Sequence, residues 1–189
     1  MYLWVRRIPV HLCMLRTATL LLVLMLSVSM FVGCGKSDNS AKSLPPIAIE
    51  PGDECHVCGM IIANFPGPKG EAYTRNSKTP LKFCSTRDLF SFLLQPESKA
   101  MVTQIYVHDM GKTDWEHPAD SAFVDARAAW YVADQPLRGA MGPTLASFKQ
   151  RKDAEAFREQ HGGRLLRFED ITLEILAKLG EGSAKSAHP

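Results

Sequence analysis

The N-terminus carries the feature that most restricts this chain. An apolar run from Ala18 to Val32 follows three arginines, contains no charged side chain and ends at Gly33-Cys34. A basic start followed by an apolar run is the pattern of a secretory signal peptide. The small residue before the cysteine resembles the recognition sequence of bacterial lipoprotein signal peptidase, although Phe31 stands where leucine is usual. We therefore expect residues 1–33 to be a lipoprotein signal peptide and Cys34 to carry the lipid.

An uncleaved membrane anchor is the alternative, because the run approaches the length of a membrane span. The polar segment that follows favours the lipoprotein: residues 35–46 are rich in Gly, Ser, Lys and Pro and cannot bury a core. We expect residues 34–46 to be the lipidated cysteine and a flexible tether. Gly35 is not the aspartate that favours inner-membrane retention, so the outer membrane is favoured. Translation can start at Met1 or at Met14.

Charge and cysteine content exclude some functions. Three of the 22 basic side chains lie in residues 1–33, which leaves 19 against 20 acidic ones. A near-neutral chain lacks the basic surface of a nucleic-acid-binding protein. Of five cysteines, Cys13 leaves with the signal peptide and Cys34 takes the lipid. The remaining three cannot all pair as disulfides in an oxidising compartment, so they indicate a free thiol or a metal site.

The segment from residue 47 to residue 179 has the same order of predicted elements twice. Apolar or alternating stretches predict strands, and capped amphipathic stretches predict helices. The first half gives strands at 60–63 and 71–75, a helix from Ser85 or Thr86 ended by Pro96, and a strand at 101–108. The second half gives strands at 129–133 and 141–148, a helix at 152–160, a strand at 164–168 and a final helix at 170–179. We therefore predict an α+β protein of two small ββαβ subdomains in tandem, residues 47–112 and 113–179, with a disordered tail at 180–189.

The segment Glu54-Cys-His-Val-Cys-Gly-Met60 is the strongest candidate for chemistry. Two cysteines separated by two residues, Cys55 and Cys58, can aim both sulfurs at one metal ion or at each other. Met60 adds a thioether, and soft sulfur ligands favour copper(I). Gly59 leaves the backbone free to turn, so that Cys58 and Met60 can approach one centre.

Three other interpretations of the two cysteines remain open. They could form a redox pair, although a thioredoxin-like pair opens a helix and here a strand is predicted. They could be half of a structural zinc site completed by Cys84 and a histidine, or they could form a simple disulfide. Spacing alone favours a zinc or structural role as much as a copper-binding role. Met60 shifts the preference towards copper.

Other candidate ligands rest on weaker patterns. Met141 lies among Gly and Ala residues, in a segment too poor in bulk for ordinary core, and is either an exposed ligand or a gap-filling side chain. His108, Met110 and His117 follow a predicted strand, and a lone histidine there is more often a surface residue than a ligand. Met101 alternates with core positions and is expected to be buried. No nucleophile–base pair, phosphate loop or carboxylate pair indicates an enzyme.

Several motifs together resemble the NosL family, the nitrous oxide reductase accessory lipoproteins of denitrifying bacteria. The resemblance runs from about Glu54 to Phe168 and rests on motifs in a fixed order: Cys55-His-Val-Cys-Gly-Met60, Phe65-Pro-Gly-Pro-Lys-Gly70, Leu81-Lys-Phe-Cys-Ser-Thr-Arg-Asp-Leu-Phe90, Tyr106-Val-His-Asp-Met110, Asp114-Trp115 and Gly139-Ala-Met-Gly-Pro-Thr-Leu-Ala146. It implies a fold of two ββαβ units. It also implies a monomeric copper(I) chaperone, not an enzyme, located in the periplasm and anchored to the membrane through Cys34.

The resemblance further implies partners and ligands. The partners are apo nitrous oxide reductase, which receives copper for its metal sites, and the membrane transporter complex of the same maturation system. Cysteine and methionine sulfur hold copper(I) in this family, with a nitrogen ligand. On this chain that indicates Cys58 and Met60 first, then Cys55 and Met141; the histidine and the role of Cys84 are left open.

Overall fold

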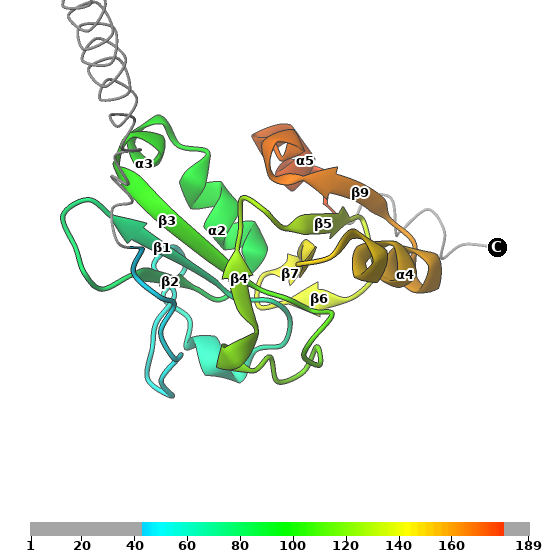
Figure 1. Cartoon of the computed structure of the whole chain (residues 1–189), viewed down its shortest axis with the longest axis horizontal. Helices are drawn as coiled ribbons and strands as arrows, with labels where there is room; N and C mark the ends of the chain where they lie inside the picture. The colour runs from blue at the N-terminus through cyan, green and yellow to red at the C-terminus, as the bar shows by residue number, and fades with distance from the viewer. Residues whose placement is uncertain (1–42, 180–189) are drawn as a thin grey trace, which may run out of the picture. The chain divides into compact units, whose positions relative to one another are not determined.

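The computed structural model describes residues 43–179. The predicted signal peptide, the lipidation site, most of the tether and the tail 180–189 lie outside the described residues. No helix in the described part has the length and hydropathy needed to cross a membrane. Strands and short helices alternate along the chain, which confirms the α+β class (Figure 1).

The first half builds a four-stranded antiparallel sheet in the order β2-β1-β3-β4. Its strands are β1 (Gly70–Thr74), β2 (Leu81–Phe83), β3 (Val102–His108) and β4 (Phe123–Asp125). Gly70 lies opposite both Phe83 and Val107. A β-carbon on Gly70 would come within 2.7 Å of Leu89 Cδ2, so this glycine allows the helix to lie directly on the sheet.

Two helices follow β2. Helix α2 (Thr86–Leu93) begins as predicted, because the Ser85 side chain accepts the amide of Asp88 as an N-cap. Helix α2 ends before Pro96, as predicted. Pro96 also begins helix α3 (Pro96–Met101), at a position where a missing amide costs nothing. Met101 was expected to be buried and this is wrong: it ends α3, just before the strand begins, and is 37% exposed.

The second half builds a three-stranded sheet in the order β8-β5-β9. Its strands are β5 (Trp130–Ala133), β8 (Ala146–Phe148) and β9 (Arg164–Arg167), and helix α4 (Arg151–His161) covers it. The predicted strand at 141–148 is interrupted: Gly142 at φ +89° closes a hairpin of β6 (Arg138–Gly139) and β7 (Gly142–Pro143) before β8 begins. Helix α5 (Leu173–Ala177) ends the described part.

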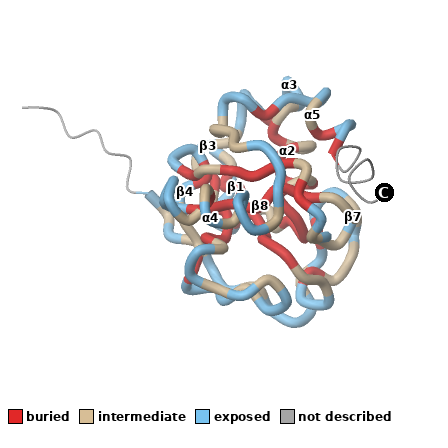
Figure 2. Tube along the Cα trace, turned by 90° about the vertical axis from the view of Figure 1, so that its right-hand side faces the viewer, coloured by how far each residue is buried: buried red, intermediate tan, exposed pale blue. Residues whose placement is uncertain are grey.

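The main core takes side chains from both halves. Phe90 of α2 meets Tyr131 of β5 nearly at right angles, with ring centroids 5.1 Å apart, and Phe168 at 5.2 Å. Leu145 and Ile171 of the second half belong to the same buried cluster. Figure 2 shows the buried segments of both halves meeting in the interior. The two halves therefore share one core. The subdomain boundary between residues 112 and 113 stays a prediction.

The chain before the cysteine motif lies as a strap, residues 43–50, across β1 and β3. Its backbone groups form hydrogen bonds of 2.6–3.2 Å with side chains of the sheet and with Asp120 of a 3-10 helix; the sheet residues are Gln104, Tyr106, Tyr73, Glu71 and Lys82. Glu71 and Tyr73 are two residues apart on β1 and therefore share one face. Part of the range predicted as tether is thus bound to the fold.

Glu71 makes the strap sensitive to pH. It is fully buried, its Oε2 accepts the Ile47 amide at 3.1 Å, and its Oε1 has no partner among the described residues. Burial raises the pKa of Glu71 from 4.5 to about 7. The folded state therefore binds a proton that the unfolded state releases, and stability falls as pH rises from about 4.5 through about 7.

We expect Glu71→Gln to remove this pH dependence. The neutral amide should leave stability unchanged at pH 5 and raise the free energy of unfolding at pH 8 by about 2 kcal/mol. Urea titrations at both pH values measure it. Glu159→Gln, at an exposed acid of α4, is the matched control and should change neither. Wild-type and Glu71→Gln curves that stay parallel from pH 5 to pH 8 would contradict the expectation.

Candidate metal centre

The cysteine motif folds as a tight loop. The Gly59 amide donates to the Cys55 carbonyl and the Cys55 amide to the Met60 carbonyl, both at 2.9 Å. Gly59 sits at φ +70°, which a side chain would oppose. The His56 amide donates to the Lys82 carbonyl at 2.9 Å and so fixes the loop to β2. The loop turns both cysteines inward, toward the end of that strand.

The predicted strand at 60–63 is wrong. The segment makes one isolated bridge, Glu54 with Ile61, and then a 3-10 helix at Ile62–Asn64. The Ile62 amide donates to the Asp53 carbonyl at 2.9 Å, which turns the chain back on itself. An apolar run here fills the core beside the loop without extending as a strand, since Ile62 is fully buried.

Cys84 and Asp88 complete a cluster with the two loop cysteines. Cys84 follows β2, and Asp88 lies in the first turn of α2, one helical turn later. Cys58 Sγ lies 3.4 Å from Cys84 Sγ, and Asp88 Oδ2 lies 3.1 Å from Cys84 Sγ and 3.6 Å from Cys55 Sγ. One ligand atom from each of the four residues lies within 4.8 Å of all the others. All three cysteines are free thiols.

The three thiols of the cluster differ in pKa. A hydrogen bond from Cys84, with backbone amides of Cys84, Cys58 and Val57, lowers the pKa of Cys55 to about 5 against the effect of burial. The hydrogen bond to Cys55, burial and the Asp88 carboxylate raise the pKa of Cys84. Burial raises the pKa of Cys58. The pKa of Cys55 is lowered and those of Cys58 and Cys84 are raised, and the thiolate is the form that binds metal.

The two candidate methionines are more exposed to solvent than the buried cysteines Cys55 and Cys84. Met60 closes the loop and is half-buried. Met141 is 47% exposed, and its carbonyl accepts Arg87 Nη1 at 3.3 Å, one residue before Asp88 on α2. The fold thus brings the turn of the β6–β7 hairpin from the second half to the first turn of α2.

The other predicted nitrogen and sulfur candidates lie elsewhere. His108 is fully buried at the end of β3, where its Nδ1 accepts the Lys69 amide at 3.1 Å and its ring stacks on Phe123. Burial lowers the pKa of His108 to about 3, so the ring is neutral. His117 is exposed and lines a separate cavity. Met110 packs against the cluster of Val132, Ala146, Phe148 and Ala154.

Sequence reasoning missed Asp88 and left Cys84 unplaced. The signal was present: a cysteine directly before a serine N-cap, with an acid in the first helical turn, places sulfur and carboxylate on the same side of a helix start. What spacing cannot give is that this helix start faces the loop 26 residues earlier. Of the predicted ligands, Cys55 and Cys58 lie in the cluster. The Met60 carbonyl accepts the Cys55 amide in the same loop, and Met141 contacts Arg87, the residue before Asp88, through its carbonyl.

Three free cysteine sulfurs and a buried carboxylate, on a small α+β fold, define a protein with a thiol-rich cluster that could hold a metal ion. The chain belongs to the NosL family, whose model matches residues 46–176.

Named relatives agree with that membership. The chain is 49% identical over 144 residues to the copper-binding lipoprotein NosL of Stutzerimonas stutzeri, which covers 76% of this chain and 75% of the relative. It is 34% identical over 154 residues to the protein of the same name from Achromobacter cycloclastes, with 79% and 80% covered. The crystal structure of the copper chaperone NosL from Shewanella denitrificans superposes with a TM-score of 0.69 at 54% identity, covering 70% of this chain and 98% of that one.

Proposed function

We propose that this protein is a copper(I)-binding chaperone that delivers copper for the maturation of nitrous oxide reductase. The observation that carries the proposal is the cluster of three cysteine sulfurs whose ligand atoms lie within 4.8 Å. Relatives in the family are named copper-binding lipoproteins, and one is named a copper chaperone. Sulfur is the ligand that favours copper(I) among biological metals.

The donor atoms of the cluster support a soft ion. Three of the four candidate ligand atoms are sulfur, and the fourth is an oxygen of the Asp88 carboxylate. Metal binding displaces thiol protons, so affinity should fall as the pH falls. The predominance of sulfur supports copper(I).

The exposure of the ligands supports release as well as binding. Cys55 and Cys84 are buried, whereas Cys58 and Met60 are half-buried and Met141 is exposed. A partner's ligand can approach copper from that side and replace one sulfur at a time. A closed four-ligand site would resist such exchange.

Met60→Ala should weaken copper(I) binding by about tenfold, because it removes a neutral thioether and leaves all three cysteines in place. Competition against a chromophoric copper(I) chelator measures the change. Met101→Ala removes a methionine at a distance from the cluster and should leave affinity unchanged. Equal affinities for wild type and Met60→Ala would remove Met60 from the ligand set.

Location and partners form part of the proposal. Cys34 carries the lipid, which anchors the chain in the periplasm, at the outer membrane by the Gly35 criterion. The chain acts as a monomer that takes copper at the membrane transporter complex of the maturation system and gives it to apo nitrous oxide reductase. It is not an enzyme, and copper is its cargo.

One observation favours a second candidate, a zinc site that scaffolds assembly. Asp88 places a hard carboxylate oxygen 3.1 Å from Cys84 Sγ. Three sulfurs and one oxygen are a complete tetrahedral donor set for zinc. The two candidates differ in whether Asp88 is a ligand.

The test is a parallel titration of the chain from Gly35 onward, reduced and kept anaerobic. Copper(I) is titrated in competition with a chromophoric chelator, and zinc is titrated in the same buffer. One tightly bound copper(I) per chain with weak zinc binding, followed by copper transfer to apo nitrous oxide reductase, is the expected result. Zinc retained through purification, with copper(I) lost to the chelator, would establish the scaffold instead.

A further inference from the structure

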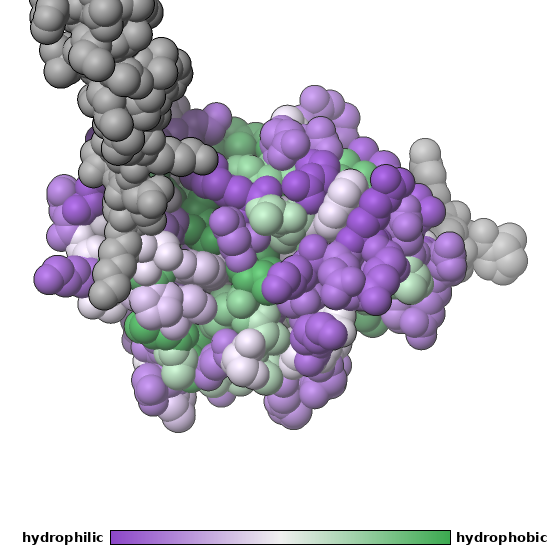
Figure 3. All heavy atoms as spheres, viewed as in Figure 1, coloured by the Kyte–Doolittle hydropathy of each residue, from purple (hydrophilic) through white to green (hydrophobic). Residues whose placement is uncertain are grey.

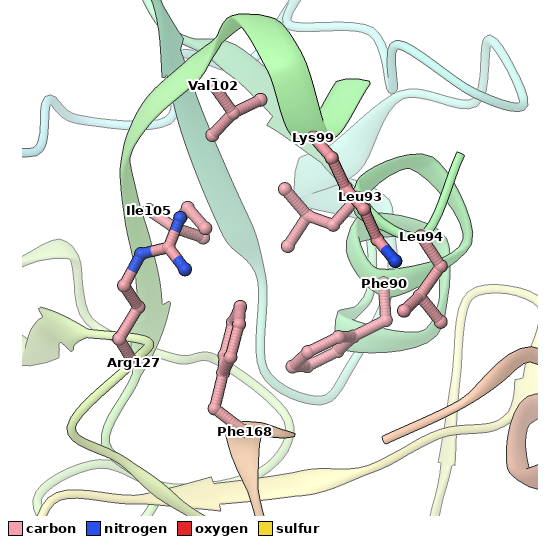
Figure 4. Close-up of a pocket in the computed structure, with 8 residues that line it drawn as sticks. All are labelled: Phe90, Leu93, Leu94, Lys99, Val102, Ile105, Arg127 and Phe168. Atoms are coloured by element: carbon pink, nitrogen blue, oxygen red, sulfur yellow. The ribbon is translucent and has the colours of Figure 1, made fainter. Parts of the chain in front are cut away.

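An apolar groove lies at the far end of α2 from the cysteine cluster. Its cavity has a volume of about 280 Å³ between α2, α3, β3 and Phe168. Figure 4 shows apolar side chains around it, with the charged ends of two cations at its two sides; the lining residues are Phe90, Leu93, Leu94, Lys99, Val102, Ile105, Arg127 and Phe168. On the face drawn in Figure 3, apolar residues surface in a band beside hydrophilic ones. The groove therefore combines apolar depth with a cationic rim.

The two rim cations are not neutralised by the described part of the chain. Neither Lys99 nor Arg127 has an ion-pair partner among residues 43–179, and both are exposed. Arg127 lies over the Phe168 ring, 5.1 Å from its centroid, and Asp125 accepts the Arg127 backbone amide, not its guanidinium. An occupant with anionic groups above an apolar interior complements this rim.

The groove lies where the chain from the membrane enters the fold. Ser43, the first described residue, lines a neighbouring cavity that shares Ile105 and Arg127 with the groove. Ser43 lies nine residues after Cys34. Nine residues span at most about 30 Å when fully extended. A lipid on Cys34 therefore keeps Ser43, which shares a cavity with Arg127, within about 30 Å of a bilayer.

Helix α2 links the groove to the cysteine cluster. Cys84 and Asp88 lie at the start of α2, whereas Leu93 and Leu94 lie at its end. Eight helical residues rise by about 12 Å. When the groove end faces the lipid, the cluster lies farther from the bilayer and open to a partner in the aqueous phase.

The geometry points to this groove as a membrane-docking face that holds anionic phospholipid. Lys99 and Arg127 contact the phosphate groups, the apolar lining receives the upper part of an acyl chain, and the cluster is presented away from the bilayer. The assignment rests on the anchor at Cys34 in the proposed function. Each basic residue near an anionic surface contributes about a fivefold bias, so the pair orients a chain that the lipid already holds at the surface.

The test uses the mature lipidated chain in vesicles of phosphatidylcholine, with or without 30% phosphatidylglycerol as a chosen composition. Amide hydrogen exchange across residues 93–102 should slow by up to about thirty-fold in the anionic vesicles relative to neutral ones. The double variant Lys99→Glu/Arg127→Glu should lose this protection and keep its copper(I) affinity. The double variant Lys152→Glu/Arg158→Glu, which changes two exposed cations of α4, should keep the protection.

Other outcomes overturn the docking face. Equal exchange in both vesicles while the chain stays bound, or full protection in Lys99→Glu/Arg127→Glu, rejects the groove and leaves the anchor and the copper proposal intact. Protection in neutral vesicles that rises with protein density assigns the groove to a second copy. A mature chain that does not stay with vesicles refutes the lipid anchor, and the docking face falls with it.

Discussion

Replacing Cys58 by serine should lower copper(I) affinity by roughly 1,000-fold or more. The substitution exchanges a soft sulfur for a hard oxygen and keeps the size of the side chain. Cys58 is the most accessible of the three sulfurs and lies 3.4 Å from Cys84 Sγ, so it is the thiol that an arriving ion meets first. Losing an outer-shell partner of a metal ligand commonly costs 10- to 100-fold, and losing the ligand itself should cost more.

The measurement is the competition titration of reduced protein against a chelator of known copper(I) affinity. Val57→Ala, at the exposed neighbour in the same loop, changes no ligand and should bind copper as the wild type does. Circular dichroism of both variants checks that the loop change leaves the fold intact. A Cys58→Ser variant with wild-type affinity would show that the cluster is not the copper site.

The loop was predictable because its information is local. Two cysteines, a glycine and a methionine within six residues indicate both the candidate ligands and the turn, and Gly59 takes the positive φ that the turn needs. The strand predicted at 60–63 is wrong because an apolar run does not have to be extended backbone. The Asp53 carbonyl captures the Ile62 amide instead, and this competition between turn and strand is not visible in residue type.

The contribution of Cys84 and Asp88 depends on tertiary contacts. Strand β2 has only three residues, too few for alternation to mark it, and its pairing with β1 is what carries Cys84 to the loop. Helices α2 and α4 were predictable, since their amphipathic faces and ends are encoded locally. That Phe90 and Tyr131 join both halves in one core depends on packing between elements that no local pattern specifies.

Asp88→Asn should separate copper from zinc. The amide keeps the shape of the side chain and removes the charge from an oxygen 3.1 Å from Cys84 Sγ. Zinc binding, which needs a fourth anionic donor, should weaken by about 100-fold. Copper(I), held by two or three sulfurs, should change by less than about threefold, because a carboxylate oxygen is a poor ligand for a soft ion.

The control is Asp153→Asn, which removes an acid from the first turn of α4. No residue of the cysteine cluster lies on α4, so this variant should change neither affinity. If Asp88→Asn weakens the binding of both metals by about 100-fold, the carboxylate is needed to bind either ion, and the zinc scaffold becomes the favoured function. If it weakens zinc alone, Asp88 is a carboxylate beside a sulfur site. Its role is then to accept the hydrogen bond of the Cys84 thiol and hold that sulfur in place.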